Sequence, residues 1–442
     1  MSALVRYFLS LGKTVAGYDR TACTLTDRLI EEGAQLHFEE NCDLIPAECR
    51  DKESTLVVYT PAIPKEHKEL CYFTQGGFEI MKRSQVLGII TRSRKGLCVA
   101  GTHGKTTTST MAAHLLHQSH VDCTAFLGGI SKNYGTNLIL SGKSDYVVIE
   151  ADEFDRSFHQ LTPYMSVVTA TDPDHLDIYG TKEAYLDSFA HYTSLIRPGG
   201  CLILHKGLQM VPRLAAGVKL YTYSRDEGDF HATNVRIGGG DIVFDFVSPK
   251  GIIKDIQLGV PVSINIENGI AAMALAQLNG VTDDEIRKGM ASFQGVERRF
   301  DFKIRNEKMA FLSDYAHHPD EIKQCALSMR ELYRGRKITA LFQPHLYTRT
   351  RDFYPQFAQS LSLFDEVILV DIYPAREQPI PGVTTRLIYD LLKPGVEKKM
   401  CSLEEVTRVI EAEKSSLEVL ISLGAGNLED KVPQITKLLL EP

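Results

Sequence analysis

The stretch GLCVAGTHGKTTTSTMAAHLLHQ, residues 96–118, predicts a buried strand that passes through a glycine turn into a helix. At the start of such a helix the backbone N–H groups point towards an anion. The turn and the beginning of the helix therefore form a candidate phosphate-binding loop, whose members are Gly101, Thr102, His103, Gly104, Lys105, Thr106 and Thr107.

Lys105 and the hydroxyl groups after it are residue types that bind a nucleoside triphosphate and its metal ion. A lysine at this position reaches the terminal phosphates, and the hydroxyl of Thr106 or Thr107 is placed to hold Mg²⁺. The spacing departs from the usual phosphate loop because Val99 stands where its first glycine would be, which leaves the shorter pattern G-T-x-G-K-T-T. The alternative is a tight turn with a surface lysine. The order of strand, glycines, lysine and hydroxyls favours ATP and Mg²⁺.

Acidic residues follow the next predicted strand, residues 146–149. Ligands of open parallel sheets lie at the carboxyl ends of the strands. Glu150, at the end of this strand, is therefore the first candidate for a magnesium ligand beside the phosphate loop. Asp152 and Asp155 come later in the same acidic run, and their simpler alternative is to favour the N-terminus of the next helix.

A third predicted strand, residues 166–170, leads to Asp172, Asp174 and His175. An imidazole among carboxylates suits a second divalent ion, whereas a lone histidine in a loop is usually only a hydrogen-bonding residue. Because two other strand ends already carry phosphate-binding and metal-binding residue types, the pattern makes His175 a candidate metal ligand.

Composition narrows the class of protein. A chain of 442 residues with 43% apolar residues predicts two or three domains, and alternating strand-like and helical patterns predict α/β architecture with mostly parallel sheets. Short alternating runs between residues 229 and 261 indicate a small antiparallel excursion.

A net charge of −7 without a basic block argues against nucleic-acid binding, and no apolar run is long enough to predict a membrane span. The nine scattered cysteines indicate reduced thiols of a cytoplasmic protein.

The rest of the chain carries polar residues at helix starts and strand ends. Asn265 and Asn268 begin an apolar helix, where asparagine either caps the helix or binds an adenine edge. Punctuation divides the chain into three blocks, of which the second runs to about Gly295 and the third begins at residues 298–301. Arg298 and Arg299 stand where these two blocks join, a place from which arginine could reach a transferring phosphate. Two later strands lead to candidates for an anion or amino-acid site. Asp314, His317 and His318 follow one of them, and His345, Arg349 and Arg351 follow the other. For each arginine taken alone, the alternative is an ordinary surface charge.

Together these motifs resemble the Mur ligases. The resemblance extends over nearly the whole chain, in the stretches GTHGKTTT from Gly101, EADEFD from Glu150, DHLD from Asp174, ERRF from Glu297, DYAHHP from Asp314, HLYTRTRDF from His345 and DIYPARE from Asp371. It implies three domains: a Rossmann-like domain for a UDP-sugar (residues 1–94), a central phosphate-loop ATPase domain with a mostly parallel sheet (95–296) and a Rossmann-like domain for an amino acid (297–442).

The resemblance also implies a reaction. An ATP-dependent carbon–nitrogen ligase of peptidoglycan precursor synthesis phosphorylates the lactyl carboxylate of UDP-N-acetylmuramate, and L-alanine attacks the acyl phosphate. The implied catalytic residues are Lys105, Glu150, His175, Arg298 and His317, and the implied metal ligands are Thr106, Glu150 and His175. The nucleotide is expected to contact Asn265 at its adenine, Asp314 at its ribose, and Arg298. The implied substrate-binding residues are Asp19, His317, His345 and Arg349. We expect a monomer or weak homodimer.

Three departures from the family pattern shape these expectations. Residues 189–191, FAH, occupy the neighbourhood in which several relatives carry a lysine that becomes carbamylated, so we expect no carbamyl-lysine. Ile264 stands before Asn265, where histidine is frequent. The family begins with a strand and a G-x-G-G-x-G loop before its first helix, whereas here that helix opens the chain, as from a misplaced start codon at Met1 or a natural truncation. We therefore expect a first sheet without a central strand and an incomplete diphosphate cradle.

Two alternatives remain to this function. One is a recycling ligase of the same family, which attaches a preformed peptide to the same sugar nucleotide; the D-H-L-D-I-Y and E-Q-P-I-P stretches favour the alanine enzyme by resemblance. The other is a nucleotide-binding protein with impaired UDP-sugar binding. ADP release that does not depend on L-alanine distinguishes the second alternative from a ligase.

Overall fold

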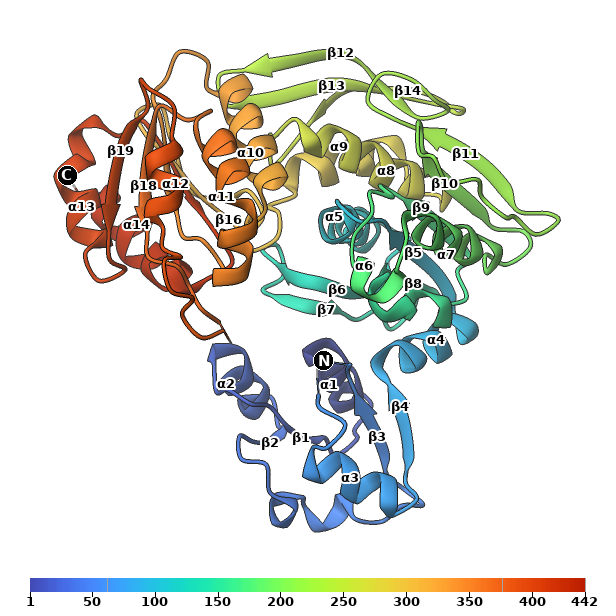
Figure 1. The fold of residues 1–442 in the computed structure, drawn as a ribbon. Helices are drawn as coiled ribbons and strands as arrows, with labels where there is room; N and C mark the ends of the chain where they lie inside the picture. Colours follow the sequence, from blue (N-terminus) through green and yellow to red (C-terminus); the bar gives the residue numbers. More distant parts are fainter. Residues whose placement is uncertain (62, 376, 442) are drawn as a thin grey trace. The chain divides into compact units, whose positions relative to one another are not determined.

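The structure is a computed structural model that describes residues 1–61, 63–375 and 377–441. The chain divides into two compact units. The first unit consists of residues 1–233, 246–253 and 267–292, and the second of residues 234–245, 254–266 and 293–442. Figure 1 labels the helices and strands along the chain, and each unit is described below by itself.

The first unit begins with short elements and two small sheets. In chain order these elements are α1 Ser2–Ser10, β1 Ala16–Tyr18, α2 Thr24–Glu31, β2 Gln35–His37, β3 Leu56–Tyr59, α3 Lys68–Gln75, β4 Glu79–Lys82 and α4 Arg83–Ser93, with 3₁₀ turns at Cys42–Leu44 and Ala47–Cys49. Strand β1 pairs with β2 and β3 pairs with β4, both in parallel. Within the described residues these are two separate two-stranded sheets, with no strand hydrogen-bonded between them.

A seven-stranded sheet forms the centre of the first unit, in the order β11-β10-β9-β5-β8-β6-β7. Its neighbours run parallel except β6 and β7, which confirms the mostly parallel architecture. The strands are β5 Lys95–Ala100, β6 Thr124–Ser131, β7 Thr136–Ile139, β8 Tyr146–Ala151, β9 Met165–Val168, β10 Cys201–His205 and β11 Lys219–Tyr223. The helices of this part are α5 Lys105–His117, α6 Leu176–Tyr179, α7 Lys182–Ser194, α8 Ile264–Leu278 and α9 Asp283–Ser292, with a 3₁₀ segment, η3, at Phe154–Gln160.

Two strand ends differ from the sequence expectation. Strand β8 continues through Ala151 because Glu150 and Ala151 pair with Val99 and Ala100 of β5, so Glu150 lies inside the strand. Strand β9 ends at Val168 rather than residue 170. Its partner β5 ends at the paired residue Ala100, where the chain turns at Gly101, and the Thr169 hydroxyl then donates to the carbonyl of His103 in the candidate phosphate loop.

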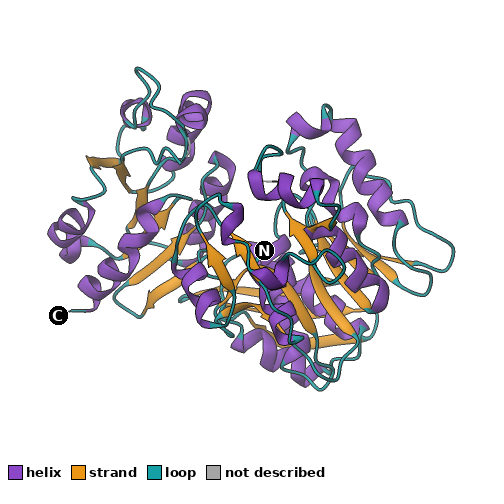
Figure 2. Cartoon of the chain, turned by 90° about the horizontal axis from the view of Figure 1, so that it is seen from below, coloured by secondary structure: helices purple, strands orange, loops and turns teal. Residues whose placement is uncertain are grey.

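The core of the first unit joins the opening helices to the central sheet. Leu4 of α1 and Leu87 of α4 belong to the same buried cluster as Phe126 of β6 and Ile149 of β8. Outside that cluster, the Arg6 side chain donates to the side-chain oxygen, Oδ1, of Asn137 in β7 at 3.0 Å. The helices of residues 1–94 therefore contribute to the core that supports the central sheet. Figure 2 shows helices (purple) packed on the faces of strands (orange).

The predicted excursion is a separate three-stranded sheet, in the order β12-β13-β14. Its strands are β12 His231–Gly238, β13 Asp241–Ser248 and β14 Gly251–Gln257. The glycine-rich stretch between the first two strands has three consecutive positive φ angles, at Gly238, Gly239 and Gly240. A side chain is disfavoured in that backbone region, so the glycines of RIGGGD serve the turn.

The second unit contains a six-stranded sheet in the order β15-β16-β20-β17-β18-β19, parallel except for β15. The strands are β15 Asp301–Arg305, β16 Ala310–Asp314, β17 Ile338–Phe342, β18 Glu366–Val370, β19 Glu397–Cys401 and β20 Val419–Leu423. The helices are α10 Pro319–Leu332, α11 Tyr347–Leu361, α12 Arg386–Leu391, α13 Val406–Glu413 and α14 Val432–Leu440, with 3₁₀ turns at Lys414–Ser416 and Asn427–Lys431. Every residue of β16, β17, β18 and β20 is buried, as the continuous apolar runs predict.

Among the described residues, no helix combines the length and apolar character that crossing a bilayer requires.

Candidate active site

The candidate phosphate loop connects β5 to α5 and depends on two glycines. Gly101 has φ 135° and Gly104 has φ 81°, both in the region that favours glycine. A Cβ at Gly101 would lie 2.1 Å from the Thr169 hydroxyl, and one at Gly104 would lie 2.8 Å from the side-chain oxygen of Asn268. The loop therefore needs both glycines because neighbouring side chains approach its backbone closely.

Hydrogen bonds fix the loop against the segment after β9. The Thr102 backbone N–H donates to the Ala170 carbonyl at 3.1 Å, and the Thr102 hydroxyl donates to the Asp172 carbonyl at 2.7 Å. The Thr102 hydroxyl also lies 2.8 Å from the Tyr185 hydroxyl. His103 is the exposed residue of this loop, and Lys105 begins α5.

The Lys105 ammonium is held by a carbonyl and a carboxylate. Its Nζ lies 2.6 Å from the Gly101 carbonyl oxygen and 2.8 Å from Glu153 Oε2. The Glu153 side chain is only 2% exposed and that of Lys105 is 13% exposed. In the sequence Glu153 is one of several acids in the run EADEFD and has no signal of its own, and only the folded structure brings the two residues together.

Glu150 lies in β8, the strand beside β5, and one glycine provides the space for it. A Cβ at Gly128 of β6 would lie 2.1 Å from Glu150 Oε2, so a larger residue there would displace the Glu150 carboxylate from its position. Sequence reasoning missed Gly128, although a glycine inside a strand marks a close approach. The carboxylate of Glu150 and the hydroxyl of Thr106 are oxygen donors of the kind that Mg²⁺ prefers.

His175 opens α6 with φ 52°. Its backbone N–H bonds the side chain of Asp174 at 2.7 Å, and its ring packs edge-on against Phe154 at 5.1 Å between centroids. In the parts of the chain that the structure describes, no three or more His, Cys, Asp or Glu side chains are grouped as a metal site. A ligand set of Thr106, Glu150 and His175 has only two such residues, so it stays a prediction.

The two asparagines of α8 are both buried but have different partners. Asn268 accepts a hydrogen bond from the Thr108 hydroxyl of α5 at 3.2 Å and thus packs against the helix that follows the phosphate loop. Asn265 donates to the Val260 carbonyl at 3.1 Å. The adenine contact expected for Asn265 remains a prediction.

In the second unit, Asp314 ends β16 and is buried. Its carboxylate accepts hydrogen bonds from the backbone N–H groups of Phe300 at 2.7 Å and Ala316 at 2.8 Å. Burial raises the pKa of Asp314 to about 6, against the lowering effects of Arg299 and these hydrogen bonds. Asp314 therefore organises the backbone on both sides of the strand end.

Three predicted substrate residues meet in the second unit. The rings of His317 and His345 lie 6.1 Å apart, and the Arg349 guanidinium lies 3.5 Å from His345 Nδ1. Burial lowers the pKa of His345 to about 4, with Arg349 as the next cause, and burial also lowers the pKa of His317. The arrangement places a cation beside two imidazoles that are neutral near pH 7.

Glu321 supports this group and was missed by sequence reasoning. Its carboxylate accepts from the backbone N–H groups of His317 at 2.9 Å and His318 at 3.1 Å, at the start of α10. The available signal was the capping-box spacing in HPDE, in which the glutamate reaches back to the residues before the helix.

Arg298 has φ 62° and reaches the loop after β20. Its guanidinium donates to the Gly424 carbonyl at 3.2 Å and lies 3.6 Å from Glu429. Both Arg298 and Arg299 lie over the ring of Tyr315, at 4.7 and 5.3 Å from its centroid. Sequence reasoning did not identify Tyr315, because a ring shared by two adjacent arginines has no spacing signal.

Asp19 follows β1 in the first unit. Its carboxylate accepts from the Thr21 N–H at 3.3 Å, and its backbone N–H donates to the carbonyl of His37 at the end of β2. It thus lies at the carboxyl ends of two neighbouring parallel strands, which is where such sheets bind ligands.

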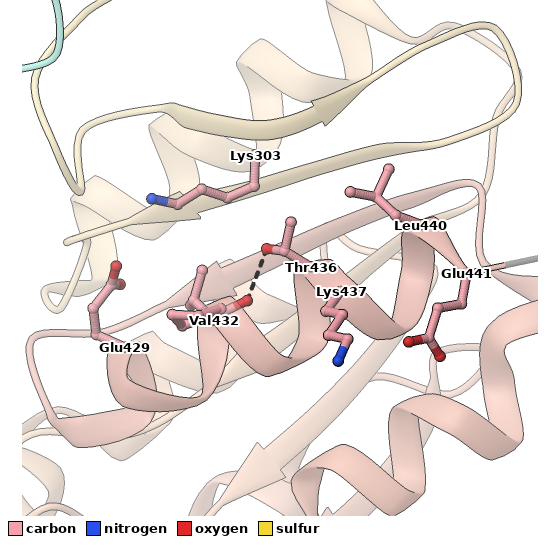
Figure 3. A pocket seen from close by; sticks show the side chains of 8 residues that line it. Lys303, Glu429, Val432, Thr436, Lys437, Leu440 and Glu441 are labelled. Carbon is pink, nitrogen blue, oxygen red and sulfur yellow. Dashed lines mark hydrogen bonds between the residues drawn. The ribbon is translucent and has the colours of Figure 1, made fainter.

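The second unit also has an open groove between β15 and α14, with a volume of about 760 Å³. Figure 3 shows Lys303 on one side and Val432, Thr436 and Leu440 of α14 on the other. No residue predicted to bind substrate or nucleotide lines this groove, although Glu429 at its end contacts Arg298.

The fold and these strand ends define a Mur ligase, and the chain belongs to that family. Residues 1–95 match the description "Mur ligase family, catalytic domain", residues 99–276 match "Mur ligase middle domain" and residues 298–426 match "Mur ligase, glutamate ligase domain". The three-domain character of the fold is therefore confirmed.

Relatives within the family are similar over nearly the full length. The UDP-N-acetylmuramate–L-alanine ligase of Phocaeicola vulgatus is 72% identical over 99% of this chain and 95% of its own length. The ligase of the same name from Porphyromonas gingivalis strain W83 is 52% identical over 99% of this chain and 96% of its own. Among solved structures, the UDP-N-acetylmuramate–alanine ligase of Thermotoga maritima matches with a TM-score of 0.82 and 25% identity, covering 99% of this chain and 96% of that one.

Proposed function

We propose that this chain joins L-alanine to the lactyl carboxylate of UDP-N-acetylmuramate, with ATP converted to ADP and phosphate, in peptidoglycan precursor synthesis. The observation that carries the proposal is the 72% identity, over 99% of the chain, to a ligase named for that reaction. The loop with Lys105 and the group of His317, His345 and Arg349 support it, because they offer a phosphate site and an amino-acid site.

The reaction has two balanced steps. A carboxylate oxygen of the sugar attacks the γ-phosphorus of ATP, which forms an acyl phosphate and releases ADP. The alanine amine then attacks the acyl carbon, loses a proton and expels inorganic phosphate as the amide forms. We infer that Lys105 and Arg298 neutralise the transferring phosphoryl group, with Asn265 at the adenine and Asp314 at the ribose.

The amino-acid site is proposed from charge. Arg349 is positioned to bind the alanine carboxylate through paired hydrogen bonds. The alanine ammonium must lose a proton before it attacks. The depressed pKa values of His317 and His345 leave both imidazoles uncharged near pH 7, so that they do not repel the ammonium, although a lower pKa also makes each a weaker base. Glu321 keeps the His317 backbone in place through its hydrogen bond.

Mg²⁺ fits the oxygen donors beside the phosphate loop. The absence of a side chain at Gly128 leaves space for the Glu150 carboxylate, which with the Thr106 hydroxyl would hold the ion. His175 is proposed as a further ligand. When bound, Mg²⁺ neutralises phosphate charge; orienting the lactyl carboxylate and excluding water fall to the protein.

The remaining assignments follow from the same function. We infer that residues 1–94 bind the UDP-sugar with Asp19 as one contact, that residues 95–296 bind ATP and that residues 297–442 bind alanine. We also propose a cytoplasmic monomer or weak homodimer, which does not bind nucleic acid or membranes.

The test measures phosphate release with ATP, Mg²⁺, UDP-N-acetylmuramate and L-alanine, each omitted in turn. Release that requires all of them supports the proposal. Release that continues without alanine contradicts it and indicates the nucleotide-binding alternative. Release with a preformed peptide but not with alanine indicates the recycling ligase. That alternative has weaker support, since the murein peptide ligase of Psychrobacter arcticus matches with a TM-score of 0.66 at 21% identity, a likeness of fold alone.

A further inference from the structure

We propose that Glu153 is a positioning residue, which orients the Lys105 ammonium towards the terminal phosphate of ATP. The proposal rests on the function proposed above and adds a residue to its machinery. Glu153 Oε2 and Oε1 lie 2.8 and 3.0 Å from Lys105 Nζ, and the Glu153 side chain is 2% exposed. A buried carboxylate is stable only with a charged or hydrogen-bonded partner, and Lys105 is that partner.

The ammonium group has three N–H donors, and two of them make short contacts in the structure. The Gly101 carbonyl receives one at 2.6 Å, and the Glu153 carboxylate receives another. The Thr102 carbonyl lies at 3.5 Å, the outer limit of a hydrogen bond. Two fixed contacts set the direction of the third N–H. Without the Glu153 carboxylate, the flexible four-carbon side chain of Lys105 would not hold the ammonium group in one direction.

Glu153 is itself firmly held. Its backbone carbonyl accepts a hydrogen bond from the Tyr179 hydroxyl at 2.5 Å, and Tyr179 is buried. The two residues after Phe154, Asp155 and Arg156, both have φ 52°, an uncommon conformation for residues with side chains. The Arg156 guanidinium lies over the Tyr179 ring at 4.8 Å. Tyr179 therefore holds the backbone of Glu153 through its hydroxyl and contacts Arg156 through its ring.

A purely structural ion pair is the alternative, and nucleotide selectivity separates the two roles. A phosphate-loop lysine meets the β- and γ-phosphates, so its orientation affects ATP more than ADP. If Glu153 aims the ammonium at the terminal phosphate, its loss reduces the preference for ATP over ADP. If the ion pair is only structural, its loss loosens the fold and weakens the binding of ATP and of ADP equally.

The experiment compares Glu153→Ala and Glu153→Gln in the full chain, by calorimetric binding of ADP and a non-hydrolysable ATP analogue and by steady-state kinetics. We expect Glu153→Ala to lower kcat roughly 100-fold, as misplaced catalytic groups do, and to reduce the ATP-to-ADP preference about tenfold. Glu153→Gln keeps an oxygen that accepts from the ammonium, so kcat stays within roughly fivefold of the parent chain and the preference is retained.

A double variant shows whether Glu153 acts through Lys105. We expect Glu153→Ala to have no further effect on nucleotide preference in a Lys105→Gln background, because the group that it orients is gone. This double variant carries neither buried charge, so it tests the proposal even if Glu153→Ala alone folds poorly. Asp155→Asn is the matched control, since it removes a nearby carboxylate that pairs instead with Lys82 at the surface.

Four results would overturn the proposal. Glu153→Ala could leave the preference for ATP over ADP unchanged, or it could weaken the binding of both nucleotides equally. Glu153→Gln could lose as much activity and preference as Glu153→Ala, or Glu153→Ala could have the same effect on the preference in the parent chain and in the Lys105→Gln background. The binding measurements do not require ligase activity. If the parent chain binds ATP but releases no alanine-dependent phosphate, the proposed function fails while the effect of Glu153 on Lys105 can still be judged.

Discussion

The seven-stranded sheet and the two short sheets of residues 1–94 belong to the same unit and are built mainly or wholly from parallel strands, but their burial differs. Leu97 to Ala100 of β5 and Val147 to Ile149 of β8 are 0% exposed. No residue of β1, β2, β3 or β4 is buried. The buried residues of the opening region come instead mainly from helices, such as Leu4 of α1 and Leu87 of α4.

This difference indicates what each region provides. A parallel sheet buried on both faces holds the phosphate loop and Glu150 rigidly, and phosphoryl transfer depends on such positioning. Two-stranded sheets with half-exposed strands contribute little stability of their own. We infer that the helices of residues 1–94, rather than its strands, fix that region to the core of the first unit.

The largest expected effect is that of replacing Lys105, which should reduce catalysis without changing the stability of the buried sheet. Lys105→Gln removes the ammonium group but leaves a side-chain donor near Glu153, and we expect it to reduce phosphate release roughly 1000-fold. Hydrogen exchange of β5 and β8 stays unchanged, because Lys105 contributes to the site and not to the sheet. The exposed Lys143→Gln is the control and retains activity. Turnover within tenfold of the parent chain would remove Lys105 from the mechanism.

Hydrogen exchange tests the comparison directly. We expect amides of β1 to β4 to exchange roughly 100-fold faster than those of β5 and β8, because half-exposed strands open locally without disrupting the main core. The measurement is mass spectrometry of peptic peptides after deuterium labelling. Equal protection in the two regions would show that the small sheets are as stable as the large one.

Sequence reasoning found the buried sheet because its signals are local. Strand β5, the glycine turn and α5 follow one another within residues 95–117, and each has its own composition signal. The same holds for Asp314, which ends β16, and for Glu150, which lies one residue before the end of β8. In these places the chain order alone places a polar residue at the edge of a parallel sheet, so the candidate could be named in advance.

Contacts between distant segments could not be predicted in this way. Glu153 lies 48 residues from Lys105, and nothing in the spacing selects it over Asp152 or Asp155. The same is true of Gly128, where a side chain would meet the Glu150 carboxylate opposite it. Such details depend on strand order and side-chain packing, which a single sequence does not encode in any local pattern.

A matched pair of core substitutions sharpens the comparison in free energy. Val148 of β8 is 0% exposed, whereas Val58 of β3 is only partly buried, against a cluster that contains Val147 and Ile149 of β8. We expect Val148→Ala to lower the free energy of unfolding by about 2 kcal/mol and Val58→Ala by less than about 1 kcal/mol. Urea unfolding followed by far-UV circular dichroism measures both. Equal losses would contradict the difference in burial.

A further prediction is a pH dependence of stability that reports burial beside the central sheet. His114 of α5 is 4% exposed, and its ring nitrogens contact the Tyr134 hydroxyl at 2.7 Å and the Ser292 hydroxyl at 2.9 Å. Burial is the main cause that lowers the pKa of His114 from 6.5 to about 4, with nearby His117 as the next. Between these values the unfolded chain binds a proton that the folded chain does not.

The stabilisation from neutral His114 is therefore complete above pH 6.5 and is lost as the pH falls towards 4, with a slope of about 1.4 kcal/mol per pH unit for one proton. We expect His114→Gln to be less stable at pH 7 but to lack this part of the slope, as measured by urea unfolding at several pH values. Between pH 7 and 8 the two curves should run parallel, which is the internal control. The same slope in both proteins between pH 4 and 6.5 would mean that His114 is accessible to protons in the folded chain, and that the central region is less closed than its 0% exposed strands indicate.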